Sequence, residues 1–129
     1  MNNLSSKIKQ YRYECDIWKR NLEFLMLENI HLKNRLSDIL KSGSADSKFL
    51  NVAEQYQNYF TTEDETIYLL RKDIADFDEL LLEEEKQKDE KKLSDVIERQ
   101  KKMSNEVEST VTEFNKIKFD FNTYLDEVL

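Results

Sequence analysis

The residues best suited to hold a metal ion are Glu28 and His31, a carboxylate and an imidazole three positions apart. On a helix this spacing places both side chains on one face, as metal ligation requires. Metal sites in helical bundles also need ligands from neighbouring helices, and His31 is the only histidine of the chain. A single copy therefore lacks the ligands for such a site, and only two copies meeting at this face would supply them. We expect no cofactor and keep Glu28 and His31 as weak metal candidates.

The sequence also offers few residues that could carry out nucleophilic catalysis. Cys15 is the only cysteine, and the one histidine that could activate it lies 16 residues further on. Along a helix that separation is about 24 Å, far beyond proton transfer. The single glycine, Gly43, also argues against a glycine-rich phosphate loop. We therefore expect a protein that is not an enzyme, with Cys15 filling core volume as a small apolar side chain.

Composition narrows the class of protein further. The 129 residues carry 20 basic and 27 acidic side chains, a formal net charge of −7, which argues against general nucleic-acid binding. The longest apolar runs, 24–27 and 80–82, fall far short of the roughly 20 residues that span a bilayer. The N-terminal residues lack the apolar stretch of a secretory signal. We expect one cytoplasmic domain, residues 1–129, that binds no membrane and no nucleic acid.

Helical periodicity dominates the chain, which has no proline and therefore few natural breaks. A strand-rich fold is excluded because its tight turns rely on glycine and proline. In the first segment, about 4–41, apolar residues recur at alternating spacings of four and three. This is the heptad pattern of coiled coils and predicts one long helix. Its seam consists of Leu4, Ile8, Tyr11, Cys15, Trp18, Leu22, Leu25, Asn29, Leu32, Leu36 and Ile39.

A second helix of about 48–85 is predicted after a linker at 42–47. Gly43 suits the residue after a helix C-terminus, and Asp46 or Ser47 offers an N-cap oxygen. In the middle of this segment Thr62-x-x-Glu65 resembles a capping box, which would restart the helix. The seam keeps its phase across that point, so we favour a continuous or mildly bent helix. The seam consists of Phe49, Ala53, Tyr56, Phe60, Glu63, Ile67, Leu70, Ile74, Phe77 and Leu81.

The boundary between the second and third segments contains no turn-forming residue. Beyond Leu81 the seam falls on polar residues such as Glu84, and the apolar stripe restarts on another phase at Leu93. This phase break favours a turn near 86–89, followed by a third helix of about 91–128. The alternative is one long solvated helix through both segments. Polar seam positions dilute the first half of the third segment, so we expect it to pack less tightly than 114–128.

Three amphipathic segments joined by two short connections predict an all-α fold, because none can bury its apolar stripe alone. The expected architecture is an elongated antiparallel three-helix bundle, about 55 Å long, with coiled-coil-like heptad packing. The first segment is net basic, whereas residues 42–85 hold 12 acidic and 3 basic side chains. This difference favours the first two helices as neighbours.

A second apolar face is predicted on the first helix, opposite its seam. A helix that is apolar on both sides is normally covered on both sides, which favours a partner surface, most simply a second copy of the chain. The alternative is that these side chains are partly exposed or lie under a neighbouring helix. The predicted interface residues are Ile17, Phe24, Met26, Leu27, Ile30 and His31.

Two polar residues interrupt the seams, Asn29 in the first helix and Glu63 in the second. A buried polar side chain can specify helix register, because leaving it unpaired is costly. Alternatively, it is solvated or bonded to nearby backbone. If both positions lie near mid-helix in antiparallel neighbours, they could share one polar layer of the core.

The sequence therefore predicts a scaffold or adaptor that acts by self-association and protein–protein interaction. The expected partners are a second copy of the chain and a basic protein that meets the acidic second helix. The alternative function is a helical bundle that binds a small ligand or metal at the dimer interface, near Glu28 and His31.

Overall fold

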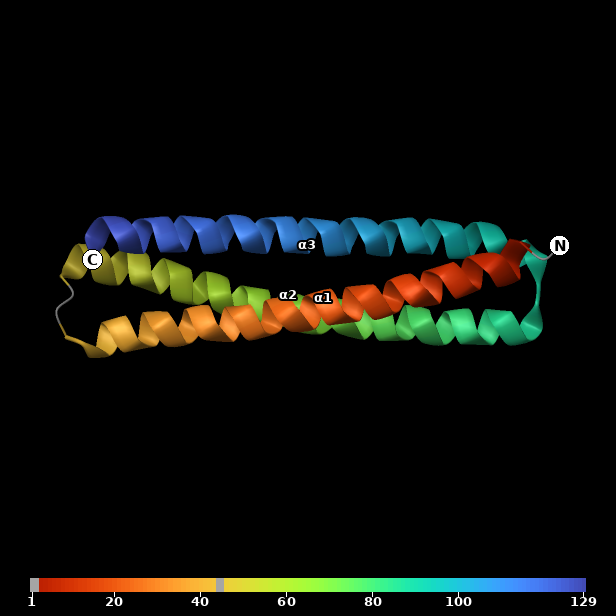
Figure 1. Ribbon diagram of the computed structural model, residues 1–129, viewed down its shortest axis with the longest axis horizontal. Helices are drawn as coiled ribbons and strands as arrows, with labels where there is room; N and C mark the ends of the chain where they lie inside the picture. Colours follow the sequence, from red (N-terminus) through yellow and green to blue (C-terminus); the bar gives the residue numbers. More distant parts are fainter. Residues whose placement is uncertain (1–2, 44–45) are drawn as a thin grey trace.

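The computed structural model describes residues 3–43 and 46–129, which form three long helices and one short 3₁₀ turn. The elements are α1 (Asn3–Lys41), α2 (Ser47–Gln87), η1 (Glu90–Lys92) and α3 (Leu93–Val128). Figure 1 shows them as an elongated bundle in which α2 runs antiparallel to both α1 and α3. The predicted all-α three-helix bundle is confirmed.

The first connection uses the end signals that the sequence indicated. Gly43 has φ of 73°, a conformation open to glycine because it has no Cβ. Asp46 then caps α2, its Oδ1 accepting a hydrogen bond of 2.8 Å from the amide of Phe49. Residues 44 and 45 of the predicted linker lie outside the described residues.

The helix α2 continues through the threonine pair at its centre, as the unbroken seam predicted. The Thr61 hydroxyl donates to the carbonyl of Gln57, one turn earlier, at 2.9 Å. It therefore bonds within the running helix instead of capping a new one. The capping-box signal at Thr62 and Glu65 is not used.

The second connection is a true turn, which rules out the single long helix. Lys88 adopts the left-handed conformation (φ 52°, ψ 38°), and its amide donates to the carbonyl of Glu84 at 2.9 Å. Asp89 then caps η1 through the amide of Lys91, and α3 follows from Leu93. Glu84, the first polar seam position after Leu81, is buried. The seam of α2 thus extends one step beyond Leu81.

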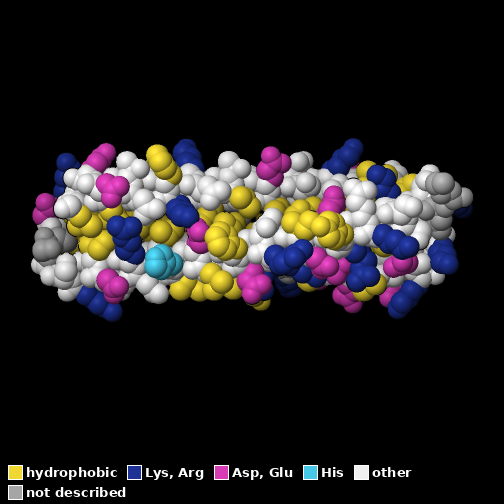
Figure 2. All heavy atoms as spheres, viewed as in Figure 1, with side chains coloured by type: hydrophobic (Ala, Val, Ile, Leu, Met, Phe, Trp, Pro, Cys, Tyr) yellow, Lys and Arg dark blue, Asp and Glu magenta, His cyan; other side chains and the backbone are white. Residues whose placement is uncertain are grey.

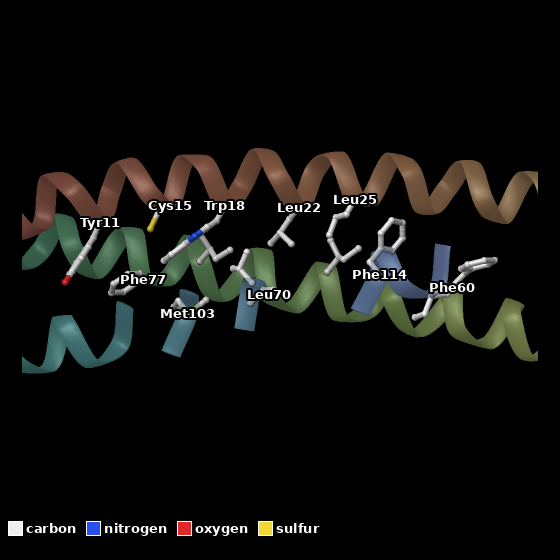
Figure 3. Packing of buried hydrophobic residues seen from close by; sticks show 14 of the residues in the cluster. Tyr11, Cys15, Trp18, Leu22, Leu25, Phe60, Leu70, Phe77, Met103 and Phe114 are labelled. Atoms are coloured by element: carbon white, nitrogen blue, oxygen red, sulfur yellow. The ribbon is translucent and has the colours of Figure 1, made fainter. Parts of the chain in front are cut away.

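The core follows the heptad seam predicted on α1, where every seam residue from Leu4 to Leu36 is buried. Figure 3 shows Cys15, Trp18, Leu22 and Leu25 directed from α1 towards the other two helices. At the end of the bundle near the first connection, α2 and α3 share a cluster of aromatic rings with centroids 5.0–6.2 Å apart. The cluster consists of Phe49, Tyr56, Phe60, Phe121 and Tyr124.

Charged side chains close the edge between α1 and α2. Arg12 and Lys19 both reach Asp78 at 3.2 Å, and Lys33 pairs with Asp64. The basic first helix therefore lies against the acidic second one. These pairs are partly exposed, so they select neighbours and register more than they add stability. Within 3–43 and 46–129, no helix has an apolar stretch of the length a bilayer requires.

Candidate interaction surface

The outer face of α1 carries large apolar side chains that the rest of the chain leaves uncovered. Phe24 is 59% exposed and Leu27 58% exposed, and Ile30 beside them is also exposed. Figure 2 shows hydrophobic side chains gathered along this face of the bundle, with the single histidine next to them. Exposed apolar residues that stand alone need no explanation, but neighbours at helical spacing form a continuous patch.

The remaining predicted interface residues differ in how far they reach solvent. Ile17 is half-buried and His31 is exposed. Met26 is half-buried, packs against the core and lies 3.4 Å from the Arg71 guanidinium through its sulfur. Met26 therefore belongs to the edge between α1 and α2, while Ile17, Phe24, Leu27 and Ile30 make up the patch itself.

Tyr13 is a further exposed side chain that sequence reasoning missed. It precedes Ile17 by four residues, and Ile17 precedes Phe24 by seven. This repeat continues the outer stripe towards the N-terminus. The spacing already placed Tyr13 on the outer stripe. An exposed tyrosine is ordinary for a protein surface, however, so it stands out only once its side of the helix is known. We define the outer face of α1 as Tyr13, Ile17, Phe24, Leu27 and Ile30.

The two weak metal candidates are not arranged as a metal site within one chain. Glu28 Oε2 accepts a hydrogen bond of 2.6 Å from the ammonium group of Lys118 on α3. This ion pair holds the carboxylate at the edge between α1 and α3. Among the described residues, no three His, Cys, Asp or Glu side chains lie close enough together to hold a metal ion.

Asn29 is fully buried and joins α1 to α2. Its Nδ2 donates to the carbonyl of Phe60 at 2.9 Å and to Asp64 Oδ1 at 2.7 Å. Asp64 in turn receives Lys33 on its second oxygen. The amide of Asn29 is thus satisfied on its donor side, while its Oδ1 has no hydrogen-bond partner. The buried atom left unpaired is therefore the acceptor Oδ1, and leaving it without a hydrogen bond costs free energy.

Glu63 lies in the core at the same height along the bundle as Asn29. The two α2 residues that Asn29 contacts, Phe60 and Asp64, flank Glu63 in sequence. Only 3% of its surface is exposed, and its Oε2 has no hydrogen-bond partner. Burial raises the pKa of the Glu63 carboxyl from 4.5 to about 7, with a smaller contribution from the Glu113 carboxylate on α3. Asn29 and Glu63 share a level but are not bonded to each other.

Cys15 is fully buried in the core beside Trp18. Burial, followed by the nearby Asp78 carboxylate, raises the pKa of its thiol to about 12. The nucleophilic thiolate is therefore not populated near neutral pH. The geometry suits a packing role for Cys15.

Comparison with protein-family models, with curated proteins and with solved structures finds no match.

Proposed function

We propose that this protein is a helical interaction module that pairs with a second copy of itself through the outer face of α1. The observation that carries the proposal is the exposed pair Phe24 and Leu27, neighbours one turn apart on a helix whose other side is fully buried. A contiguous apolar patch costs free energy in water and marks an interaction site.

A second copy of the chain is the simplest partner for the outer face. In a two-fold interface both chains contribute the same patch, so one apolar face on α1 supplies both halves of the contact. Ile17, Phe24 and Leu27 lie within eleven residues on one side of the helix, so two antiparallel copies of α1 can cover each other's apolar side chains.

Sedimentation equilibrium at about 100 μM tests this function, a concentration at which micromolar dimers are fully populated. The wild-type protein is expected at twice the chain mass of 15.5 kDa. Phe24→Asp is expected at the monomer mass with unchanged helical circular dichroism, because Phe24 lies outside the core. The charge would have to be buried unpaired in the interface.

Phe119→Asp is the matched control, because Phe119 on α3 is even more exposed, at 71%. This variant is expected to keep the wild-type mass. A wild-type monomer at this concentration contradicts the proposal. So does an equal loss of mass in both variants, which would mean that the outer face of α1 has no special role.

A further inference from the structure

The edge between α2 and α3 is built differently from the two edges that involve α1. A hollow opens there, lined by Thr66, Leu69 and Asp73 of α2 and by Asn105, Glu106 and Ser109 of α3. A second hollow continues along α3 as far as Asp95 and shares Asp73 and Glu106 with the first. Because α1 occupies the third corner of the bundle, this groove opens away from the outer face of α1.

Small polar side chains keep the groove open. The aromatic cluster fills the space between α2 and α3 at the other end of the bundle, with Phe60 and Phe121 in edge-to-face contact. The lining of the groove instead includes Thr66, Ser109 and Thr110, whose side chains are much shorter than aromatic rings. Ser109 and Thr110 lie in the first half of α3, which its polar seam positions led us to expect to pack less tightly than 114–128.

The groove carries more acidic than basic side chains, with Asp73, Asp95, Glu98 and Glu106 lining its two hollows and Arg99 and Lys102 lining the second. Within the described residues, every ion pair involves α1, and none joins α2 to α3. Asp73 and Glu106 line the groove from opposite helices, and neither has an ion-pair partner there. The guanidinium of Arg99 lies over the Phe77 ring instead, 5.9 Å from its centre. The first hollow contains the carboxylates of Asp73 and Glu106 and no lysine or arginine, which favours a cationic ligand there.

An apolar contact is available beside these carboxylates. Leu69 is 50% exposed at the rim of the groove, and Leu70 contributes to its lining from within the core. The groove runs along the helix axes from Asp95 to Thr110 of α3, about 22 Å of helix. A helix laid into it would complete a four-helix arrangement, and helix-in-groove docking uses this combination of apolar centre and charged rim.

We propose that the α2–α3 groove binds a basic amphipathic helix of another protein, with apolar residues against Leu69 and with lysine or arginine between Asp73 and Glu106. This surface is separate from the outer face of α1 and does not depend on self-association. The occupant is basic because the two hollows together carry four carboxylates against two cations, and α2 as a whole is acidic.

Fluorescence anisotropy with a labelled peptide tests the proposal. The probe is a helix-forming peptide of about 20 residues, long enough to cover the groove, with leucines spaced three and four apart and lysines flanking them. A scrambled peptide of identical composition, which has no apolar face, is the ligand control. The expected result is saturable binding of the amphipathic peptide alone, weakened by added salt.

Asp73→Asn combined with Glu106→Gln is expected to weaken binding by about tenfold or more. Glu79→Gln combined with Glu83→Gln removes the same charge from exposed positions of α2 outside the groove and is expected to leave binding unchanged. Equal weakening by both pairs would mean general attraction to an acidic surface and would overturn the proposal. Equal binding of the scrambled peptide, or no binding by the wild-type protein, would also overturn it.

Measuring each proposal's variants in the other proposal's assay distinguishes the two proposals. Phe24→Asp is expected to bind the peptide as the wild type does, whether or not the wild type is dimeric. Asp73→Asn with Glu106→Gln is expected to leave the sedimentation mass unchanged. If this double variant instead changes the mass without peptide present, the groove holds a second copy of the chain and the proposal of a basic partner is wrong.

Discussion

Asn29 on α1 and Asp64 on α2 are joined across the bundle by a hydrogen bond of 2.7 Å between Nδ2 and Oδ1. The second hydrogen of the same amide goes to the carbonyl of Phe60, and Lys33 reaches the second oxygen of Asp64. These contacts bind one buried side chain of α1 to a single turn of α2. They define one register of the two helices, since sliding either helix would leave a buried amide without its acceptors.

Asn29→Ala is therefore expected to lower the free energy of unfolding by about 1–3 kcal/mol, because two buried hydrogen bonds disappear. Asn34→Ala is the matched control on the same helix, at an exposed position, with an expected change within about 0.5 kcal/mol. Urea denaturation followed by circular dichroism measures both. Equal stability of Asn29→Ala and the wild type would contradict the assigned hydrogen bonds.

Glu63 makes stability depend on pH in a specified direction. Its pKa in the folded protein, about 7, is raised above the value of 4.5 expected when unfolded. Between these values the folded state binds more protons than the unfolded state, so the free energy of unfolding falls as pH rises. The contribution of the Glu63 carboxyl group to the free energy of unfolding is fully present below pH 4.5 and is lost as pH rises through 7.

Glu63→Gln removes this titration and is expected to stabilise the protein at pH 8 by about 1–3 kcal/mol, because no charge is then left unpaired in the core. The advantage over the wild type should shrink steadily between pH 8 and pH 5. Thermal unfolding of both proteins across this pH range gives the difference between their free energies of unfolding. The contributions of other titrating groups are the same in both proteins and cancel in this difference. A difference that is independent of pH would show that Glu63 does not titrate as described.

Lys88 is the only described residue other than glycine with positive φ. A side chain in this conformation strains the backbone, so Lys88→Gly is expected to raise the free energy of unfolding by about 0.5–1 kcal/mol. Lys86→Gly, two residues earlier in the last turn of α2, is expected to lower it by about 1 kcal/mol because glycine weakens a right-handed helix. Chemical denaturation compares them. If both substitutions destabilise the protein, Lys88 does not adopt the left-handed conformation described.

The positions of the helices and the core face of α1 were determined by the sequence alone. Every seam residue from Leu4 to Leu36 is buried, and α2 runs unbroken through Thr61 because the apolar phase is kept there. Heptad periodicity is a local property, and it specifies which side of a helix must face its neighbours. The end signals at Gly43 and Asp46 are local in the same way.

Tertiary structure decided what no single helix encodes. Glu84 is a polar residue after an apolar seam, and only the packing of α2 against the other helices shows it buried. The bonding of Asn29 to Asp64, and the separation of α2 from α3 around Asp73 and Glu106, depend on how far each helix slides and tilts. Periodicity reports the angle of a side chain around its own axis, but burial and pairing depend on the distances between axes, which the whole bundle sets.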